Sequence, residues 1–300
     1  MRVLVTGAHG QVGYELLRRA PAGFTVLGYG SQELDVCDAA QVQAVFDAVK
    51  PELVINAAAY TAVDKAESEI ERAYAVNADG VGLLAATAEK HGIPLLHIST
   101  DYVFSGEHDR PYTPDDFTQP TGVYGSSKLA GEHQLALNCS RHIVLRTSWV
   151  FGAHGNNFVK TMLRLGAERD SLSVVDDQRG GPTSAGSIAD TLWSLAAIFQ
   201  REGKLEWGVY HFSGQPACTW YDFARAIFNQ AVSLGLLEKS PDVQAISTAR
   251  YPTPAKRPTW SVLDCTKLTQ THGLPHRHWE DELVRVLHQL SGRSTAENAQ

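Results

Sequence analysis

Three glycines follow directly on a short apolar run at the start of the chain. Residues 2–6 (RVLVT) predict a strand, Gly7, Gly10 and Gly13 come next, and residues 14–19 have helical character. In such a unit the first glycine permits the tight turn, the second lets the backbone approach a pyrophosphate, and the third lets helix and strand pack closely. The helix N-terminus then offers free N–H groups and a positive dipole end to phosphate. We therefore expect a dinucleotide-binding α/β unit rather than a plain glycine turn, with contacts from these glycines, Gln11 and Val12.

Composition and charge exclude several classes of protein. The 300 residues suffice for one large α/β domain or for two lobes, and 43% of them are hydrophobic and 20% charged, as in ordinary globular proteins. The formal net charge is −7 and no basic run occurs, which argues against nucleic acid as a partner. The apolar runs are too short to span a membrane, and the first strand begins too early for a signal peptide.

The four cysteines, at positions 37, 139, 218 and 265, are scattered and form no Cys-x-x-Cys pair. This spacing favours reduced thiols in a cytoplasmic protein over a metal site or a disulfide framework. We therefore expect a cytoplasmic protein that has no metal centre and that binds neither membrane nor nucleic acid.

A tyrosine and a lysine four positions apart form a second pattern. On a helix Tyr124 and Lys128 lie on one face, and a neighbouring ammonium lowers the pKa of a phenol, which makes it usable as a proton donor. Alone the pattern is weak, since a packed Tyr and a solvated Lys on one helix explain it equally well. Thr100 strengthens it, because it follows the predicted strand 94–98, at whose carboxyl end open α/β sheets place their ligands.

The glycine spacing, Thr100 and the Tyr-x-x-x-Lys pattern, in this order, resemble the extended branch of the short-chain dehydrogenase/reductase superfamily. The resemblance implies that Asp35 and Val36 flank the adenine of a nicotinamide cofactor. It implies further cofactor contacts from the segment that ends the third strand, namely Ala57, Ala58, Ala59 and Tyr60, and from Tyr124 and Lys128. It also implies that Asn77 supports the lysine through water, although a turn or capping asparagine would look the same.

The residues that would distinguish NADPH from NADH are ambiguous. The second strand ends in residues 28–31 without the acid that reads a ribose 2′-hydroxyl. No Lys or Arg for a 2′-phosphate occurs between Arg19 and Lys50, and His9, Ser31 and Gln32 are weak phosphate ligands. We expect NADPH to be the cofactor, and NADH is the alternative that the sequence leaves open.

Longer phrases narrow the resemblance. Residues 61–67, 99–104, 146–150, 155–158, 177–183 and 251–258 look like the dTDP-4-dehydrorhamnose reductase family, and the likeness runs from Val3 to about Trp279. It implies reduction of the 4-keto group of dTDP-4-dehydro-L-rhamnose to dTDP-L-rhamnose. Tyr124 would then donate the proton, Lys128 would lower its pKa and hold the nicotinamide ribose, and Thr100 would orient the ketone. Substrate contacts are expected from Thr100, Asp101, Trp149, Asn157, Gln178 and Arg257, although packing or solvated loop positions also explain the last four and Asp101.

The expected fold is a doubly wound parallel sheet of the Rossmann type with a smaller C-terminal substrate lobe. Residues 1–150 form the dinucleotide-binding domain, with returning elements from about 159–203. Residues 204–300, with the loops 151–158 and 176–183, form the lobe, and the polar tail after Ser291 is expected to fray.

Two other functions fit the same motifs. A nucleotide-sugar epimerase or dehydratase shares the fold, but a dehydratase carries an Asp-Glu pair after the active-site Thr, where this chain has Asp101 and Tyr102. The regulatory subunit of methionine adenosyltransferase, which is not an enzyme, also keeps the fold and the cofactor loop. The intact set of Thr100, Tyr124 and Lys128 favours catalysis. The sequence leaves a homodimer open.

Overall fold

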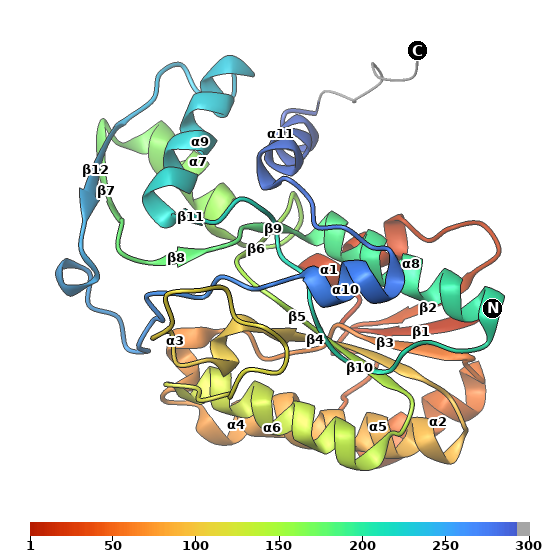
Figure 1. The fold of residues 1–300 in the computed structure, drawn as a ribbon. Coiled ribbons are helices and arrows are strands. Elements are labelled where there is room, and N and C mark those ends of the chain that lie inside the picture. Colours follow the sequence, from red (N-terminus) through yellow and green to blue (C-terminus); the bar gives the residue numbers. More distant parts are fainter. Residues whose placement is uncertain (293–300) are drawn as a thin grey trace.

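A six-stranded parallel sheet forms the centre of the protein (Figure 1). The computed structural model describes residues 1–292, and the fraying expected for the tail falls, from residue 293 onward, outside this range. The strand order is β10-β5-β4-β3-β1-β2. The bounds are β1 (Arg2–Thr6), β2 (Thr25–Tyr29), β3 (Leu53–Asn56), β4 (Leu95–Thr100), β5 (His142–Thr147) and β10 (Gly208–His211). The order reverses between β1 and β3, and open α/β sheets bind their ligands beside such a reversal, at the carboxyl ends of the strands.

Two layers of helices cover the sheet (Figure 1). One face carries α2 (Ala39–Val49), α4 (Ile70–Tyr74), α5 (Gly80–Lys90) and α6 (Val123–Asn138), with a π-helical turn (Ala75–Asp79) between α4 and α5 and the short α3 (Val63–Ala66) before α4. The other face carries α1 (Gln11–Arg18), α8 (Ala185–Glu202) and α10 (Thr266–His272). The strands alternate to match: Val3 and Val5 belong to the core under α1 and α8, and Leu4 to the core under α2 and α5. The predicted doubly wound fold is confirmed.

Local sequence signals determine where several helices begin and end. The Asp38 side chain accepts hydrogen bonds from the first turn of α2, and Ser184 does the same for α8. Thr219 and Asp222 form a capping box at the start of α9 (Trp220–Ser233). Gly203 ends α8 with a φ of 70°, a left-handed conformation that glycine adopts without strain.

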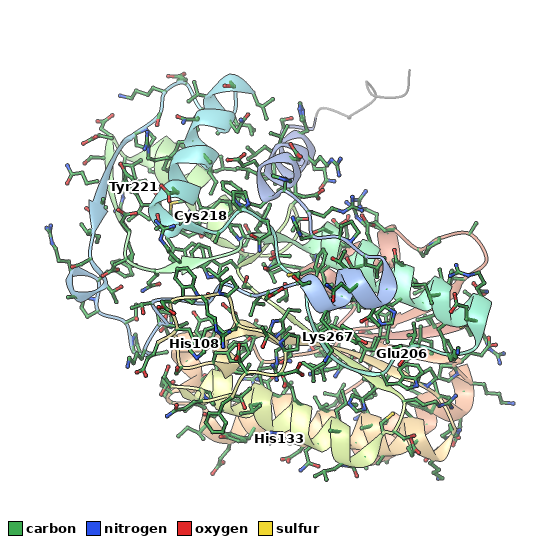
Figure 2. All side chains as sticks on the ribbon, in the orientation of Figure 1. His108, His133, Glu206, Cys218, Tyr221 and Lys267 are labelled. Atoms are coloured by element: carbon green, nitrogen blue, oxygen red, sulfur yellow. The ribbon has the colours of Figure 1, made fainter. Side chains whose placement is uncertain are left out.

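A smaller lobe packs on the carboxyl side of the sheet (Figure 1). Its helices are α7 (Phe158–Glu168), α9 and α11 (Trp279–Leu290), and its main strands are β7 (Ser171–Val175) and β12 (Asp242–Ile246). Short pairs connect it to the sheet: β6 (Val150–Phe151) with β9 (Thr183–Ser184), and β8 (Arg179–Gly180) with β11 (Cys218–Thr219). Figure 2 shows side chains packed throughout the lobe and between the sheet and its helices. Cys218 and Tyr221 lie in the lobe, and His133 lies on the outer side of α6.

The expected boundary between the two parts differs from the structure in two places. The helix α7 and the strand β7 were expected among the returning elements of the first domain, but both pack in the core of the lobe, where Phe223 and Trp279 also lie. The strand β10 and helix α10 were expected in the lobe, but β10 pairs with β5 and extends the main sheet. The pairing buries Tyr210 against that sheet, and the free energy of this hydrophobic burial favours a place in the main sheet although the strand lies late in the sequence.

Among the residues that the structure describes, no helix combines the length and the apolar character that crossing a bilayer requires.

Candidate functional site

The glycine loop lies at the reversal of strand order, between the ends of β1 and β3. Gly7 has a φ of +69°, and a Cβ there would overlap the backbone of Ala57 and Ala58. A Cβ on Gly13 would overlap the Gly7 carbonyl oxygen, so the helix could not start so close to the strand. Helix α1 has no side-chain cap and no acidic residue in its first turn. Its unsatisfied N–H groups and its dipole therefore fit a dinucleotide pyrophosphate.

The predicted catalytic residues come together beside this loop. Thr100 is the last residue of β4, and Tyr124 and Lys128 lie on one face of α6. The side chain of Thr100 lies close enough to the Tyr124 hydroxyl to lower its pKa. A Cβ on Gly125 would overlap the Tyr102 carbonyl oxygen, so glycine at this position lets α6 lie close to the end of β4.

Burial dominates the ionisation of the two helix residues. It raises the pKa of Tyr124 to about 12, against a lowering by the neighbouring Thr100 side chain. Burial also lowers the pKa of Lys128 to about 8, partly offset by the charge of Glu132. The Lys128 amine donates to the Ile98 carbonyl oxygen at 2.7 Å. In the free protein burial therefore decides the pKa of Tyr124, and the lowering of that pKa by Lys128 stays a prediction.

Asp101 is buried beside the catalytic residues. Its Oδ1 accepts a hydrogen bond from Thr100 at 3.0 Å, and its Oδ2 has no hydrogen-bond partner in the described part of the chain. Burial raises the pKa of Asp101 to about 6, although hydrogen bonds such as that from Thr100 oppose this. An unsatisfied buried carboxylate oxygen fits the predicted role of Asp101 as a ligand contact.

Asp101 makes the stability of the protein depend on pH. Its folded pKa of about 6 lies above the unfolded value of about 3.9, so its contribution is complete below pH 4 and is lost as the pH rises through 6. We expect Asp101→Asn to lose less stability than the wild type between pH 4 and pH 7, by about 1–2 kcal/mol. Urea unfolding at both pH values measures this difference, and parallel curves for the two proteins would contradict it.

Asn77 is held by hydrogen bonds within the protein. It is buried in the π-helical turn and exchanges two hydrogen bonds with the backbone of Tyr60, at 2.8 and 3.0 Å. A third joins it to the hydroxyl of Ser127, the residue before Lys128. Asn77 therefore holds the segment after β3 against α6, and its support of the lysine through water stays a prediction.

The Tyr60 hydroxyl itself donates to Glu69 on the helix side, at 3.0 Å. Ala57, Ala58 and Ala59 lie at the end of β3, next to the glycine loop. Asp35 is exposed and Val36 is buried after β2, at the same edge of the sheet.

Glu33 is a residue that the sequence analysis missed. Its carboxylate accepts a hydrogen bond from Gly30 at 2.8 Å, just beyond the end of β2, and lies 3.8 Å from the His9 imidazole of the glycine loop. This is the place of the acid that reads a ribose 2′-hydroxyl. Its spacing of twenty residues from Gly13 could have indicated it, but an acid was expected only among residues 28–31, at the end of the second strand.

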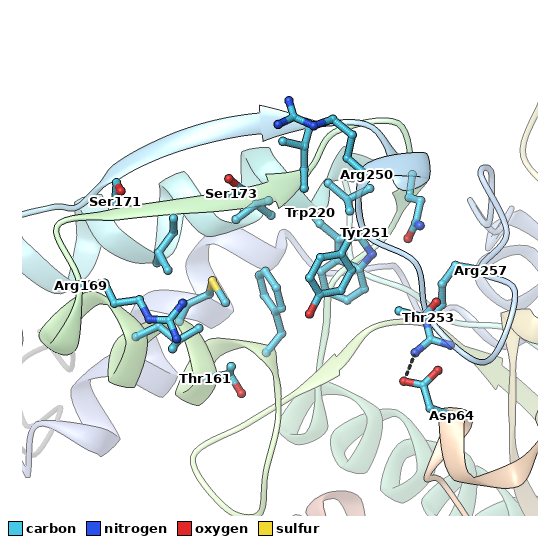
Figure 3. A pocket seen from close by; sticks show the side chains of 18 residues that line it. Asp64, Thr161, Arg169, Ser171, Ser173, Trp220, Arg250, Tyr251, Thr253 and Arg257 are labelled. Carbon is cyan, nitrogen blue, oxygen red and sulfur yellow. Dashed lines mark hydrogen bonds and ion pairs between the residues drawn. The ribbon is translucent and has the colours of Figure 1, made fainter. Parts of the chain in front are cut away.

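A cavity of about 700 Å³ lies in the small lobe, between α7, β7 and the segment after β12 (Figure 3). Gln178 and Arg257, both expected substrate contacts, line it. Arg257 is ion-paired with Asp64 of α3 at 2.8 Å, and Gln178 donates to Thr248 at 3.0 Å. The lining includes cationic and aromatic residues that the sequence analysis did not predict as contacts: Arg169, Arg250, Phe158, Trp220 and Tyr251. Apart from the adjacent Arg250 and Tyr251, they come from separate segments.

Trp149 and Asn157 are engaged within the protein. Trp149 follows β5 with a left-handed φ of 47° and stacks on Trp220, with 3.6 Å between ring centroids. The Trp149 indole also packs on Gly180, where a Cβ would overlap it. Asn157 caps α7 and donates to Gln11 at 2.9 Å, so it joins the lobe to the cofactor loop. These contacts account for both residues by packing, and their substrate contacts stay predictions.

Comparisons with known proteins agree with the motifs. The chain matches the family described as RmlD substrate binding domain over residues 1–291. A dTDP-4-dehydrorhamnose reductase from Aggregatibacter actinomycetemcomitans is 47% identical over 287 residues, which are 95% of this chain and 98% of that protein. A solved dTDP-4-dehydrorhamnose reductase from Clostridium acetobutylicum has a TM-score of 0.89 at 38% identity and covers 97% of this chain and 100% of its own. The structure from Bacillus anthracis, in complex with NADP, has a TM-score of 0.89 at 35% identity, with coverages of 96% and 99%.

The predicted resemblance is thereby confirmed over nearly the whole chain. Over 97% of the chain, the fold superposes on that of the solved reductase from Clostridium acetobutylicum, with a TM-score of 0.89. The chain therefore belongs to the dTDP-4-dehydrorhamnose reductase family of oxidoreductases.

Proposed function

We propose that this protein reduces the 4-keto group of dTDP-4-dehydro-L-rhamnose to a hydroxyl, giving dTDP-L-rhamnose, with NADPH as the preferred reductant. The observation that carries this proposal is that Thr100, at the carboxyl end of β4, and Tyr124, at the start of α6, come together beside the glycine loop. A relative of known structure binds NADP, and the relatives' name specifies the substrate.

Each catalytic residue has a separate task in this reaction. Reduced nicotinamide, when bound, supplies the hydride to the sugar C4. Negative charge then develops on the carbonyl oxygen, and Tyr124 donates its hydroxyl proton to that oxygen. Thr100 orients the same oxygen by a hydrogen bond, and Lys128 holds the nicotinamide ribose and assists the loss of the tyrosine proton. Asp101 Oδ2, which has no hydrogen-bond partner among the described residues, accepts a hydrogen bond from a hydroxyl of the sugar.

The cavity in the small lobe suits the nucleotide part of the substrate. Arg257 offers a cation to a diphosphate, and Phe158 and Trp220 offer aromatic faces to a base. Arg169 lies at the other end of the cavity from Arg257, and the guanidinium of Arg250 points away from it (Figure 3). Arg257 is bound to Asp64 in this structure, so a diphosphate would compete with that carboxylate.

Glu33 sets the balance between the two cofactors. A carboxylate beyond β2 accepts hydrogen bonds from a ribose diol but repels a 2′-phosphate, whereas His9 attracts the phosphate when protonated. We expect Glu33→Gln to raise kcat/KM for NADPH relative to NADH by about two- to fivefold, because the removed charge is solvent-exposed and screened. Initial rates with both cofactors measure the ratio, and Glu107→Gln, on an exposed loop, serves as the control.

Turnover with the verified keto sugar tests the function directly. We expect oxidation of NADPH, followed by its absorbance, to depend on the sugar and to yield dTDP-L-rhamnose by mass and NMR. Conversion of the sugar without consumption of cofactor would indicate an epimerase. Tight NADPH binding without turnover, together with stable association with methionine adenosyltransferase, would indicate a regulatory subunit.

A further inference from the structure

A row of buried polar side chains runs across the sheet beneath α6. Thr6, Asn56 and His97 are neighbours in register on β1, β3 and β4. Each lies two positions beyond an apolar residue of the core under α2, α5 and α6 (Leu4, Val54 and Leu95). Their exposed fractions are 1%, 1% and 0%, so every hydrogen bond in the row forms away from water.

The orientation of the Asn56 amide follows from one backbone group. The N–H of Ala58 donates to Asn56 Oδ1 at 3.0 Å, and the Thr6 hydroxyl donates to the same oxygen at 2.7 Å. Because a backbone N–H can only donate, the amide oxygen must lie on this side. The amide nitrogen then faces His97 Nδ1 at 3.0 Å.

The tautomer of His97 follows from the orientation of the Asn56 amide. An amide nitrogen can only donate, so His97 Nδ1 must accept. A neutral imidazole that accepts at Nδ1 carries its proton on Nε2. Burial lowers the pKa of His97 well below its ordinary value, which agrees with a neutral ring.

The protonated Nε2 points at the catalytic lysine, with 3.3 Å between His97 Nε2 and Lys128 Nζ. An ammonium has only donors and would set two N–H groups against each other. An uncharged amine accepts from His97 and donates to the Ile98 carbonyl oxygen, so all its contacts are satisfied. We propose that His97 is a positioning residue that presents an N–H fixed by Asn56 and thereby favours the uncharged amine of Lys128 over its ammonium in the free protein.

Other titratable groups lie around Lys128, and their effects on its charge differ. Glu132, on the same helix, favours the ammonium, but its carboxylate is already bound by Arg146 and by the Ser99 hydroxyl. Tyr124 shares the helix face and stays protonated, because its pKa is about 12. His142, on β5, acts on His97 through its charge alone.

The inference rests on the proposed function only for its consequence in catalysis. If the Lys128 ammonium assists Tyr124, the basic limb of the pH profile reports the loss of that ammonium. The limb should then fall near pH 8 rather than near the ordinary value for lysine.

Two NMR measurements on the free wild-type protein test the proposal without relying on turnover. The ¹⁵N shifts of the His97 ring should show a bare Nδ1 and a protonated Nε2. The ¹³Cε resonance of Lys128, assigned by its loss in Lys128→Met, should titrate near pH 8. A proton on Nδ1, or titration of Lys128 at the ordinary value for lysine, would overturn the proposal even if the protein is an active reductase.

A substitution separates positioning from mere packing. In His97→Gln the side-chain amide can turn its oxygen toward Lys128, so we expect the titration midpoint and the basic limb to rise together by about 1 pH unit. His272→Gln, a histidine on α10 away from the row, should leave both unchanged. An unchanged midpoint in folded His97→Gln would reduce His97 to a packing residue, and if that variant does not fold, the wild-type tautomer alone decides.

Discussion

Replacing Tyr124 with phenylalanine is expected to lower kcat by about 10²–10⁴-fold, the range that general acid catalysis contributes. The substitution removes one hydroxyl, which lies beside Thr100, and keeps the ring that lies 5.5 Å from that of Tyr102. The loss of a single polar contact costs about 1 kcal/mol, so the fold is expected to persist. Turnover with saturating NADPH and keto sugar measures the effect, and circular dichroism checks the fold.

A second tyrosine provides the matched control. Tyr210 is buried on β10, and its hydroxyl donates to the Glu206 carbonyl oxygen at 2.7 Å, away from the site. Tyr210→Phe should cost a similar amount of stability and leave kcat unchanged. Near wild-type turnover in Tyr124→Phe would refute the assignment of Tyr124 as proton donor, whereas equal losses in both variants would point to a general structural effect.

The largest loss of stability is expected from breaking the ion pair of Glu132 and Arg146. Both side chains are 5% exposed and are joined by hydrogen bonds of 2.6 and 3.0 Å. Arg146→Met would leave the Glu132 carboxylate buried without its partner, at a cost of about 3–5 kcal/mol. Urea unfolding monitored by tryptophan fluorescence measures the free energy of unfolding. Glu132→Leu combined with Arg146→Met should recover much of the loss, because neither buried charge then remains.

An exposed pair of the same chemistry serves as the control. Arg164 and Glu168 lie four residues apart on α7, with side chains 61% and 52% exposed. Arg164→Met should cost less than about 1 kcal/mol, because water and salt screen the pair. If Arg146→Met costs no more than Arg164→Met, the buried pair does not stabilise the junction of α6 and β5.

Much of the sheet was predictable because its signals are local. The glycine loop lies between an apolar strand and a helix, and the Thr100 strand and the Tyr124 helix have the periodicity of their elements. Gly7 was predicted to permit the tight turn and Gly13 the close packing of helix and strand. In the structure Gly7 has a φ of +69°, and a Cβ at either position would overlap neighbouring backbone atoms. The predicted family is confirmed for the same reason, since its phrases are contiguous in sequence.

The boundary of the lobe and the ionisation of the site were not predictable in this way. β10 lies late in the chain and joins the sheet because pairing with β5 buries its apolar face. Glu33 reaches the end of β2 only because the chain turns back at Gly30. Trp149 and Trp220 are far apart in sequence and stack through the junction of the two parts.

By itself the sequence determined the strand–glycine–helix unit, the order of the catalytic residues and the family, because each depends on side chains a few positions apart. Only the tertiary structure decided which charges those residues carry. The pKa of Lys128 falls to about 8 because α6 buries it, and the His97 that faces it comes from a different strand. Desolvation and contacts between distant segments exist only in the packed protein, so no local pattern encodes them.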